Sequence, residues 1–296
     1  MLLPANPNAK TPTIFVVNKG DGVREIAYNL KAKGLIRNSI VFFLLLKKLG
    51  LDKEIEAGDF RLSPSMTTED IAKNLTHGTL DIWVTIPEGK RAEEIAEILK
   101  EKIPTYKPQW TDVLVQKEGY LFPDTYLIPK DADIELIVSL MLKNFENKYA
   151  TIQMNERNKL SKNDSVIAAS LVEREARFPE DRIFVASVIL NRLKIGMKLD
   201  IDATVQYALG FQEDKKTWWE KELTTEDLKI NSLYNTYINP GLPPKPIANP
   251  GIAALKAVLE PQDSEYLYYI SDKGGHNHYA KTPAEHYANI KKYEVN

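Results

Sequence analysis

Two glutamates close an apolar stretch in the segment VIAASLVEREARFPED, residues 166–181. Glu173 and Glu175 flank Arg174 and follow a run of mostly apolar residues. A carboxyl group held against apolar surroundings has a raised pKa, because burial disfavours its charged form. A general acid that works near neutral pH needs such a raised pKa. The stretch therefore indicates either an acid for proton transfer or a helix that leaves the core and ends in a charged surface turn.

Only one of the two glutamates can face a given substrate. Residues two apart on a helix point about 200° away from each other. If Glu175 is the acid, Glu173 is a supporting carboxylate, paired with an arginine such as Arg177 or Arg192. The alternative for Glu173 is a plain surface charge.

The histidines form the second group of residues that could do chemistry. His276, His278 and His286 lie close together, and an H-x-H pair with a third histidine is compatible with zinc. The pattern lacks the H-E-x-x-H spacing and any cysteine, so an exposed hairpin is favoured and no metal or other cofactor is predicted. Ser170 and Ser187 have no histidine and aspartate at suggestive spacing, which argues against a serine hydrolase.

Composition narrows the classes of function. The chain has 296 residues, enough for two or more domains, with 39 Lys and Arg against 41 Asp and Glu. This near balance and the lack of a long basic cluster argue against a nucleic-acid partner. The chain has no cysteine, which excludes disulfides and thiolate chemistry. The most apolar run, residues 39–46, is too short to cross a bilayer.

The elements that must position these residues begin with a repeated pattern. Residues 14–36 and 83–103 each read as a short strand, a glycine turn and a helix, and aligning Gly20 with Gly89 superposes their apolar positions. A weaker third copy covers 59–78. No copy contains a catalytic constellation.

The rest of the chain is predicted to be rich in helices. Helices are expected over 134–150, 164–175, 179–194 and 251–259, followed by a strand pair that turns on Gly274 and Gly275. The predicted class is α+β with several domains. The expected divisions are 1–11, a tail or the juncture left by an omitted upstream segment; 12–78, a first strand–turn–helix domain; 79–130, a second such unit with a connector; and 131–296, a catalytic domain.

Five ordered sequence blocks resemble a known family. They are ASLVEREA, NRLKIGMKLDIDATVQYALG, YNTYINPGLPP, IANPGIAALKAVLEP and YLYYISDKGGHNHYAKTPAEH, in the order seen in endolytic murein transglycosylases of the MltG/YceG family. The resemblance implies a bacterial inner-membrane enzyme with an N-terminal anchor, absent from this chain, and its catalytic part on the outer side. It also implies that the first third is LysM-like, that glycan strands of peptidoglycan are the substrate, and that penicillin-binding synthases are possible partners.

The same resemblance implies a mechanism with one glutamate and no metal. A lytic transglycosylase cleaves the bond from N-acetylmuramic acid to N-acetylglucosamine and leaves a 1,6-anhydro end, so it consumes no water. Glu175 aligns with the family's acid. It also resembles the acid of lysozyme-like transglycosylases, which closes a helix shortly before a proline, here Pro179.

Several polar residues are candidates to bind the sugar or to support the acid. Each has a structural alternative, as a cap, turn, packed loop or hairpin residue. Adjacent Trp218 and Trp219 could stack on sugar rings, although one of two neighbouring tryptophans often packs instead. The polar candidates are Glu173, Asp202, Thr204, Tyr234, Asn235, Tyr237, Asn249 and His276.

Two other functions fit the same sequence. One is a non-catalytic peptidoglycan-binding or division scaffold, and the other is a muramidase that uses water. Weighing the muropeptides released from peptidoglycan distinguishes them, because anhydro ends, reducing ends and intact sacculi are three different products.

Overall fold

A computed structural model describes residues 2–9, 11–76, 81–155 and 159–293. The chain divides into two units, each built from separate stretches of sequence. Unit 1 comprises Met1–Val84, Lys102–Thr105 and Tyr126–Ala132. Unit 2 comprises Thr85–Glu101, Tyr106–Thr125 and Asp133–Asn296.

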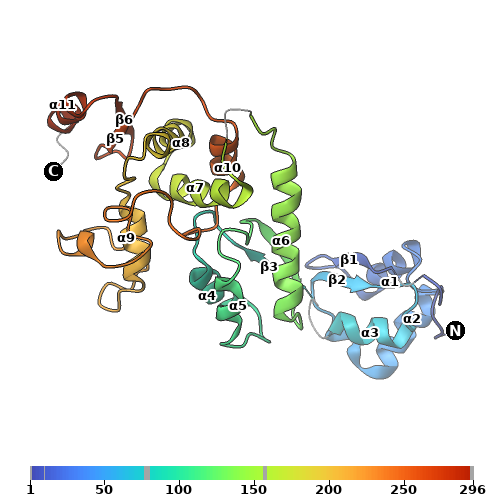
Figure 1. Cartoon of the computed structure of the whole chain (residues 1–296). Helices are drawn as coiled ribbons and strands as arrows, with labels where there is room; N and C mark the ends of the chain where they lie inside the picture. Colours follow the sequence, from blue (N-terminus) through green and yellow to red (C-terminus); the bar gives the residue numbers. More distant parts are fainter. Residues whose placement is uncertain (1, 10, 77–80, 156–158, 294–296) are drawn as a thin grey trace. The chain divides into compact units, whose positions relative to one another are not determined.

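The described residues of unit 1 include a two-stranded antiparallel sheet, three α-helices and a short 3-10 helix (Figure 1). Phe15 lies opposite Phe60 in the sheet, and both side chains are buried, whereas Ile14 and Val16 face outward. This alternation follows from the two-residue period of a strand and gives the helices one apolar face to cover. The elements are β1 (Thr13–Val17), α1 (Val23–Ala32), α2 (Ser39–Leu49), a 3-10 helix (Leu51–Lys53), β2 (Gly58–Leu62) and α3 (Thr68–Thr76).

Helix α2 is the apolar run that the sequence analysis excluded as a membrane span. It begins after Asn38, whose side chain accepts hydrogen bonds from the backbone N–H groups of Ile40 and Val41. It ends at Gly50, whose φ of 73° lies in the left-handed region that glycine adopts most easily. Within the described residues, no helix has both the length and the apolar character needed to cross a bilayer.

Strands β3 (Asp81–Thr85) and β4 (Thr125–Pro129) form a second pair, and the division between the two units runs through both strands. The helix that follows β3 belongs mostly to unit 2. The two intervening helices are α4 (Ala92–Lys102) and α5 (Trp110–Val115).

Unit 2 is mainly helical. Helix α7 passes through its core, since every residue from Ser165 to Val172 is buried, and α8 and α10 pack against it (Figure 1). Helix α7 begins at the cap Ser161 and ends at Glu175, because Ala176 is extended and Pro179 starts the next helix. Besides α4 and α5, its helices are α6 (Ile134–Ala150), α7 (Lys162–Glu175), α8 (Pro179–Lys194), α9 (Asp202–Leu209), a 3-10 helix (Asp227–Lys229), α10 (Ile252–Leu259) and α11 (Pro283–Tyr293).

A β-hairpin lies near the C-terminus, as predicted. Strands β5 (Tyr268–Ser271) and β6 (Asn277–Ala280) pair antiparallel and turn through Gly275, whose φ is 88°. The predicted α+β class is confirmed: the described residues form helices with separate two-stranded sheets.

Candidate active site

Glu175 is the last residue of α7, and its side chain receives a hydrogen bond from the C-terminal hairpin. The Tyr269 hydroxyl, on β5, donates to Glu175 Oε2 over 2.8 Å. Glu175 remains partly exposed to solvent. The end of the buried helix therefore presents a carboxyl group that is both oriented and accessible.

The surroundings of Glu175 raise its pKa. Burial is the main cause, and the nearby charge of Asp202 acts in the same direction. The Tyr269 hydroxyl and the Ala203 backbone N–H oppose them, because both donate to the charged carboxylate. Glu175 therefore keeps its proton to a higher pH than an ordinary glutamate, as a general acid must.

A second carboxylate lies close to the first. Asp202 is the first residue of α9, and its Oδ1 accepts a hydrogen bond from the Tyr237 hydroxyl over 2.5 Å. Burial, and then this hydrogen bond, raise the pKa of Tyr237, so the hydroxyl stays a donor. Each carboxyl group is thus held by one neutral tyrosine.

Thr204 and Asn235, two residues predicted to bind the sugar or to support the acid, are buried. Their side chains hold the segments that carry Asp202 and Tyr237. Thr204 donates to Ile201 O over 2.6 Å and contacts Thr236 Oγ1 at 3.0 Å, which joins α9 to the following loop. Asn235 Oδ1 accepts from the Tyr237 backbone N–H over 2.9 Å. The Asn235 amide group donates to two backbone carbonyls, those of Leu228 and Ile230.

Glu173 has different partners from Glu175. Its Oε1 lies 2.8 Å from Nη2 of Arg182, and its Oε2 accepts the Gly251 backbone N–H over 3.0 Å. The predicted pairing of Glu173 with an arginine is confirmed, but the two arginines given as examples were wrong. Arg177 and Arg192 instead donate to backbone carbonyls. Glu173 therefore ties α7 to α8 and to the start of α10.

His276 lies near the end of α7, on the hairpin turn. Its exposed ring stacks on Phe178 with ring centres 4.2 Å apart and planes 12° from parallel. Arg177 Nη1 fastens the same turn by donating to Gly274 O over 3.3 Å. His276 and Phe178 together form a short exposed aromatic surface.

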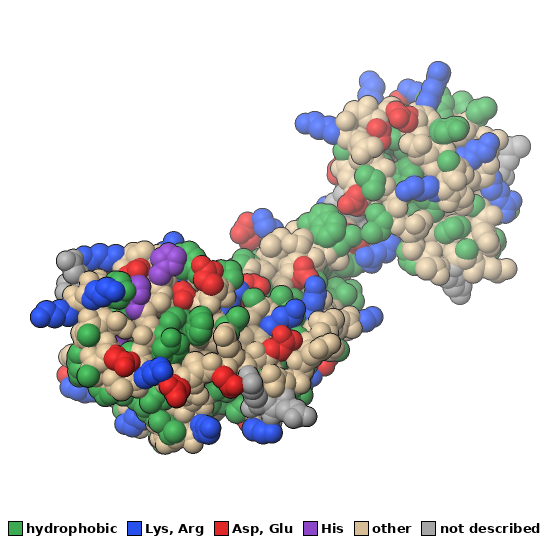
Figure 2. All heavy atoms as spheres, turned by 90° about the horizontal axis from the view of Figure 1, so that it is seen from above, with side chains coloured by type: hydrophobic (Ala, Val, Ile, Leu, Met, Phe, Trp, Pro, Cys, Tyr) green, Lys and Arg blue, Asp and Glu red, His purple; other side chains and the backbone are tan. Residues whose placement is uncertain are grey.

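Within the part of the chain that the structure describes, the histidine side chains gather on one part of unit 2 (Figure 2). His278 Nε2 lies 2.9 Å from Asp272 Oδ2 and its ring stacks on Tyr293, while His286 stacks on Tyr268. Across the described residues, no group of three or more His, Asp or Glu side chains is arranged to hold a metal ion.

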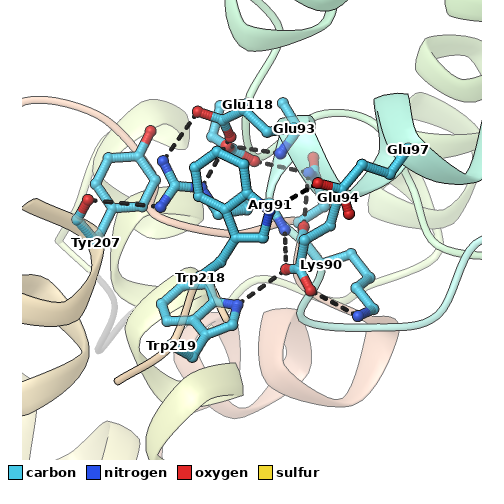
Figure 3. A network of polar contacts seen from close by, with 11 residues as sticks. Lys90, Arg91, Glu93, Glu94, Glu97, Glu118, Tyr207, Trp218 and Trp219 are labelled. Atoms are coloured by element: carbon cyan, nitrogen blue, oxygen red, sulfur yellow. Dashed lines mark hydrogen bonds and ion pairs between the residues drawn. The ribbon is translucent and has the colours of Figure 1, made fainter. Parts of the chain in front are cut away.

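A second network of polar contacts is centred on Arg91 and includes the predicted residues Trp218 and Trp219 (Figure 3). The Arg91 guanidinium forms two bonds to Glu93, of 2.8 and 2.9 Å, and lies over the rings of Tyr207 and Trp218. Tyr234 packs on Tyr207 with ring centres 4.8 Å apart. These aromatic side chains hold an arginine next to α4.

Trp218 and Trp219, the candidates for stacking on sugar rings, both form hydrogen bonds in the Arg91 network. The Trp218 and Trp219 indole N–H groups donate to Glu97 and Glu94, over 3.1 and 2.9 Å. The Arg174 guanidinium lies 3.6 Å from the ring centre of Trp219, so it covers one face of that ring.

Asn249 is buried in the same region and joins three segments. It accepts from the Leu121 backbone N–H and donates to Lys90 O and Glu118 Oε1, over 2.9, 3.0 and 2.7 Å. Glu118 also accepts the Ala92 backbone N–H at the start of α4 over 2.9 Å. Burial raises the pKa of Glu118 to about 8.

Tyr269, Arg182, Arg91 and Glu118 were not predicted from the sequence. Tyr269 lies in the run YLYYISD, which contains three tyrosines. The sequence does not show which of them bonds Glu175, because that depends on the fold. A cavity of about 590 Å³ lies elsewhere in unit 2, beside α8 and residues 261–264, and Glu175 does not line it.

Comparison with known proteins gives consistent matches. The sequence profile of the YceG-like family matches residues 15–292. A Bacillus subtilis protein named endolytic murein transglycosylase is 32% identical, over 99% of this chain and 88% of that protein. A Streptococcus pneumoniae protein of the same name is 29% identical, over 98% of this chain and 60% of that protein. A crystal structure of a YceG-like protein from Listeria monocytogenes matches with a TM-score of 0.60 and 30% identity, over 94% of this chain and 99% of that one.

Proposed function

Because the chain belongs to the YceG-like family, we propose that it is a lytic transglycosylase that cuts the glycan strands of peptidoglycan internally. The observation that carries the proposal is the Glu175 carboxyl, with its raised pKa, its hydrogen bond from Tyr269 and its partial exposure at the end of a buried helix.

In the proposed reaction Glu175 acts twice. Its protonated carboxyl gives a proton to the glycosidic oxygen as the bond from that oxygen to C1 of N-acetylmuramic acid breaks. The resulting carboxylate takes the proton of the muramyl C6 hydroxyl as that oxygen attacks C1. The C6–O–C1 bond closes a 1,6-anhydro ring, and the glutamate ends protonated again, so neither water nor a cofactor is consumed.

The neighbouring residues support these two states. The Tyr269 hydroxyl stabilises the carboxylate between the two proton transfers, and the charge of Asp202 favours the protonated form before the first. Positive charge develops at C1 in such reactions, and the carboxylate of Asp202 would offset it. The exposed surface of His276 and Phe178 would contact a sugar ring.

We further propose the cellular setting that the family resemblance implies. The catalytic unit would work on the outer side of the bacterial inner membrane, with an N-terminal anchor and penicillin-binding synthases as partners. Unit 1 would act as a LysM-like module that holds the glycan strand or braces the catalytic unit, and it would supply no catalytic group.

Asp202 also supports a second candidate, a water-using muramidase, because ordinary glycosidases use two carboxylates. Digesting purified sacculi and weighing the muropeptides separates the two. We expect 1,6-anhydro ends. Reducing muramic acid ends would establish the muramidase, and intact sacculi would point to a non-catalytic scaffold.

Substitution of the acid tests the assignment of Glu175. We expect Glu175→Gln to lower turnover by about 10²-fold or more, because the amide keeps the shape of the side chain but has no proton to give. Glu180→Gln, an exposed carboxylate at the start of α8, is the matched control and should keep full activity. Near-normal activity in a folded Glu175→Gln protein would exclude Glu175, and loss only in Glu173→Gln would transfer the role to Glu173.

A further inference from the structure

One face of unit 1, formed by α1 and α2, exposes large apolar side chains that the core does not use. Tyr28, Ile40 and Leu44 are 67%, 68% and 58% exposed. They border a groove of about 430 Å³, which we call the α1–α2 groove. Its lining residues are Arg24, Ala27, Tyr28, Ser39, Ile40, Phe43 and Leu44.

The spacing of these residues makes the groove a continuous surface. Ile40 and Leu44 are four apart on α2, and Arg24 and Tyr28 are four apart on α1, so each pair forms a stripe along its helix. The opposite side of α2 already fills the core with Phe42, Leu45 and Leu46. Single exposed apolar residues are ordinary, but a contiguous set that lines a groove is typical of an interaction surface.

The two helices that line the groove carry an excess of positive charge, although one of their cations, Lys47, forms an ion pair with Asp52. Residues 23–49, all of which the structure describes, contain six Lys and Arg and one carboxylate, Glu25. The Arg24 guanidinium and the Lys47 ammonium lie 5.3 and 6.0 Å from the centre of the Phe43 ring.

We propose that the α1–α2 groove binds the surface of a lipid bilayer that carries anionic headgroups. The apolar stripes would enter the interfacial region while Arg24 and Lys48 contact phosphate groups. A second copy of the chain fits less well, since symmetric pairing of this face would set its cations against the same cations. The proposal does not depend on Glu175 or on the reaction.

The test measures how the full chain partitions onto phosphatidylcholine vesicles prepared with and without phosphatidylglycerol. We expect binding to the anionic vesicles that weakens as salt is added. Ile40→Gln with Leu44→Gln should weaken it by about tenfold or more, because two apolar contacts are lost while glutamine keeps the helix propensity. Arg24→Glu with Lys48→Glu should weaken it several-fold and reduce its dependence on salt.

A matched control comes from the outer face of β1 in the same unit. Ile14 and Val16 are 46% and 45% exposed, and Ile14→Thr with Val16→Thr removes apolar surface there while keeping β-branched side chains. This variant should bind like the parent, and circular dichroism should show all variants folded.

Three outcomes would overturn the proposal. One is that the parent chain binds neither kind of vesicle. Another is that the β1 variant loses as much binding as the α2 variant. The third is a concentration-dependent dimer in sedimentation that Ile40→Gln with Leu44→Gln abolishes while vesicle binding is unchanged, which would assign the groove to a second copy.

Discussion

At the scale of single residues, two neighbours shift the pKa of Glu175 in opposite directions. The Tyr269 hydroxyl donates to the carboxylate and lowers its pKa, whereas the charge of Asp202 raises it. The acid form is the one that starts the proposed reaction, so activity should fall as pH rises through the pKa of Glu175.

This opposition gives a pair of predictions with opposite signs. Tyr269→Phe removes a donor to the charged form, so the pKa of Glu175 rises and the basic limb of the rate profile should move to higher pH. Asp202→Asn removes a neighbouring negative charge, so the pKa falls and the same limb should move to lower pH. The measurement is kcat/KM for muropeptide release across pH. Shifts of the same sign in both variants would contradict the assignment of the limb to Glu175.

Glu118 provides a prediction about stability and not about activity. Its folded-state pKa of about 8 exceeds that of an unfolded glutamate, so the folded chain holds this proton more tightly. The associated stability is present below the unfolded pKa and is lost as pH rises toward the folded value. We expect Tm to fall between about pH 5 and 9, and to fall less in Glu118→Gln. If Tm falls equally steeply with pH in the parent and in Glu118→Gln, Glu118 does not titrate in this range. Glu180→Gln, which changes an exposed carboxylate, is the control and should behave like the parent.

At the scale of elements, the Arg91 network holds the start of α4 in unit 2. Arg91 is buried, bonds both oxygens of Glu93 and lies between two aromatic rings. The Arg91 side chain is buried and that of Glu93 is 20% exposed. Because Arg91→Ala removes the buried cation and its packing on two rings, it should lower the unfolding free energy by about 3 kcal/mol.

Denaturant unfolding measures this effect. Lys229→Ala, which removes an exposed pair with Glu226, should leave the midpoint unchanged. Arg91→Lys should fall between the two, since an ammonium keeps the charge but has no planar fork to bond both Glu93 oxygens. A fully stable Arg91→Ala protein would mean that the aromatic residues alone hold α4.

The helices that could be predicted from the sequence are those with characteristic residues at their ends, such as proline, acidic residues or glycine. Helix α8 was placed at 179–194 from the proline and acidic residues at its start and the glycine after its end, and α6 was placed at 134–150. Helix α2 was not predicted, because a run that is apolar on every side has no period to read.

Glu175 could be proposed from its residue type and setting. Its partner Tyr269 is 94 residues away, and only tertiary packing brings the two together.

At the scale of the whole molecule, the segment 85–101 belongs with the helical unit that follows and not with the strands before it. Gly89 O accepts from Arg174 and the Gly89 N–H donates to Asn249 O, while the Ala92 N–H donates to Glu118. We therefore expect a fragment that starts at residue 85 to unfold cooperatively on heating. One that starts at residue 104 should show a lower Tm or no cooperative transition, because those buried partners are lost. Equal melting of the two fragments would contradict this division.

The hairpin that carries Tyr269 also has a consequence for the timing of synthesis. A ribosome makes the chain from its N-terminus, so Glu175 emerges long before the tyrosine that orients it. The site cannot be completed until the 94 residues that follow Glu175, up to Tyr269, have also left the exit tunnel. An enzyme that cuts the cell wall would thus be kept inactive as a nascent chain by the order of its own translation.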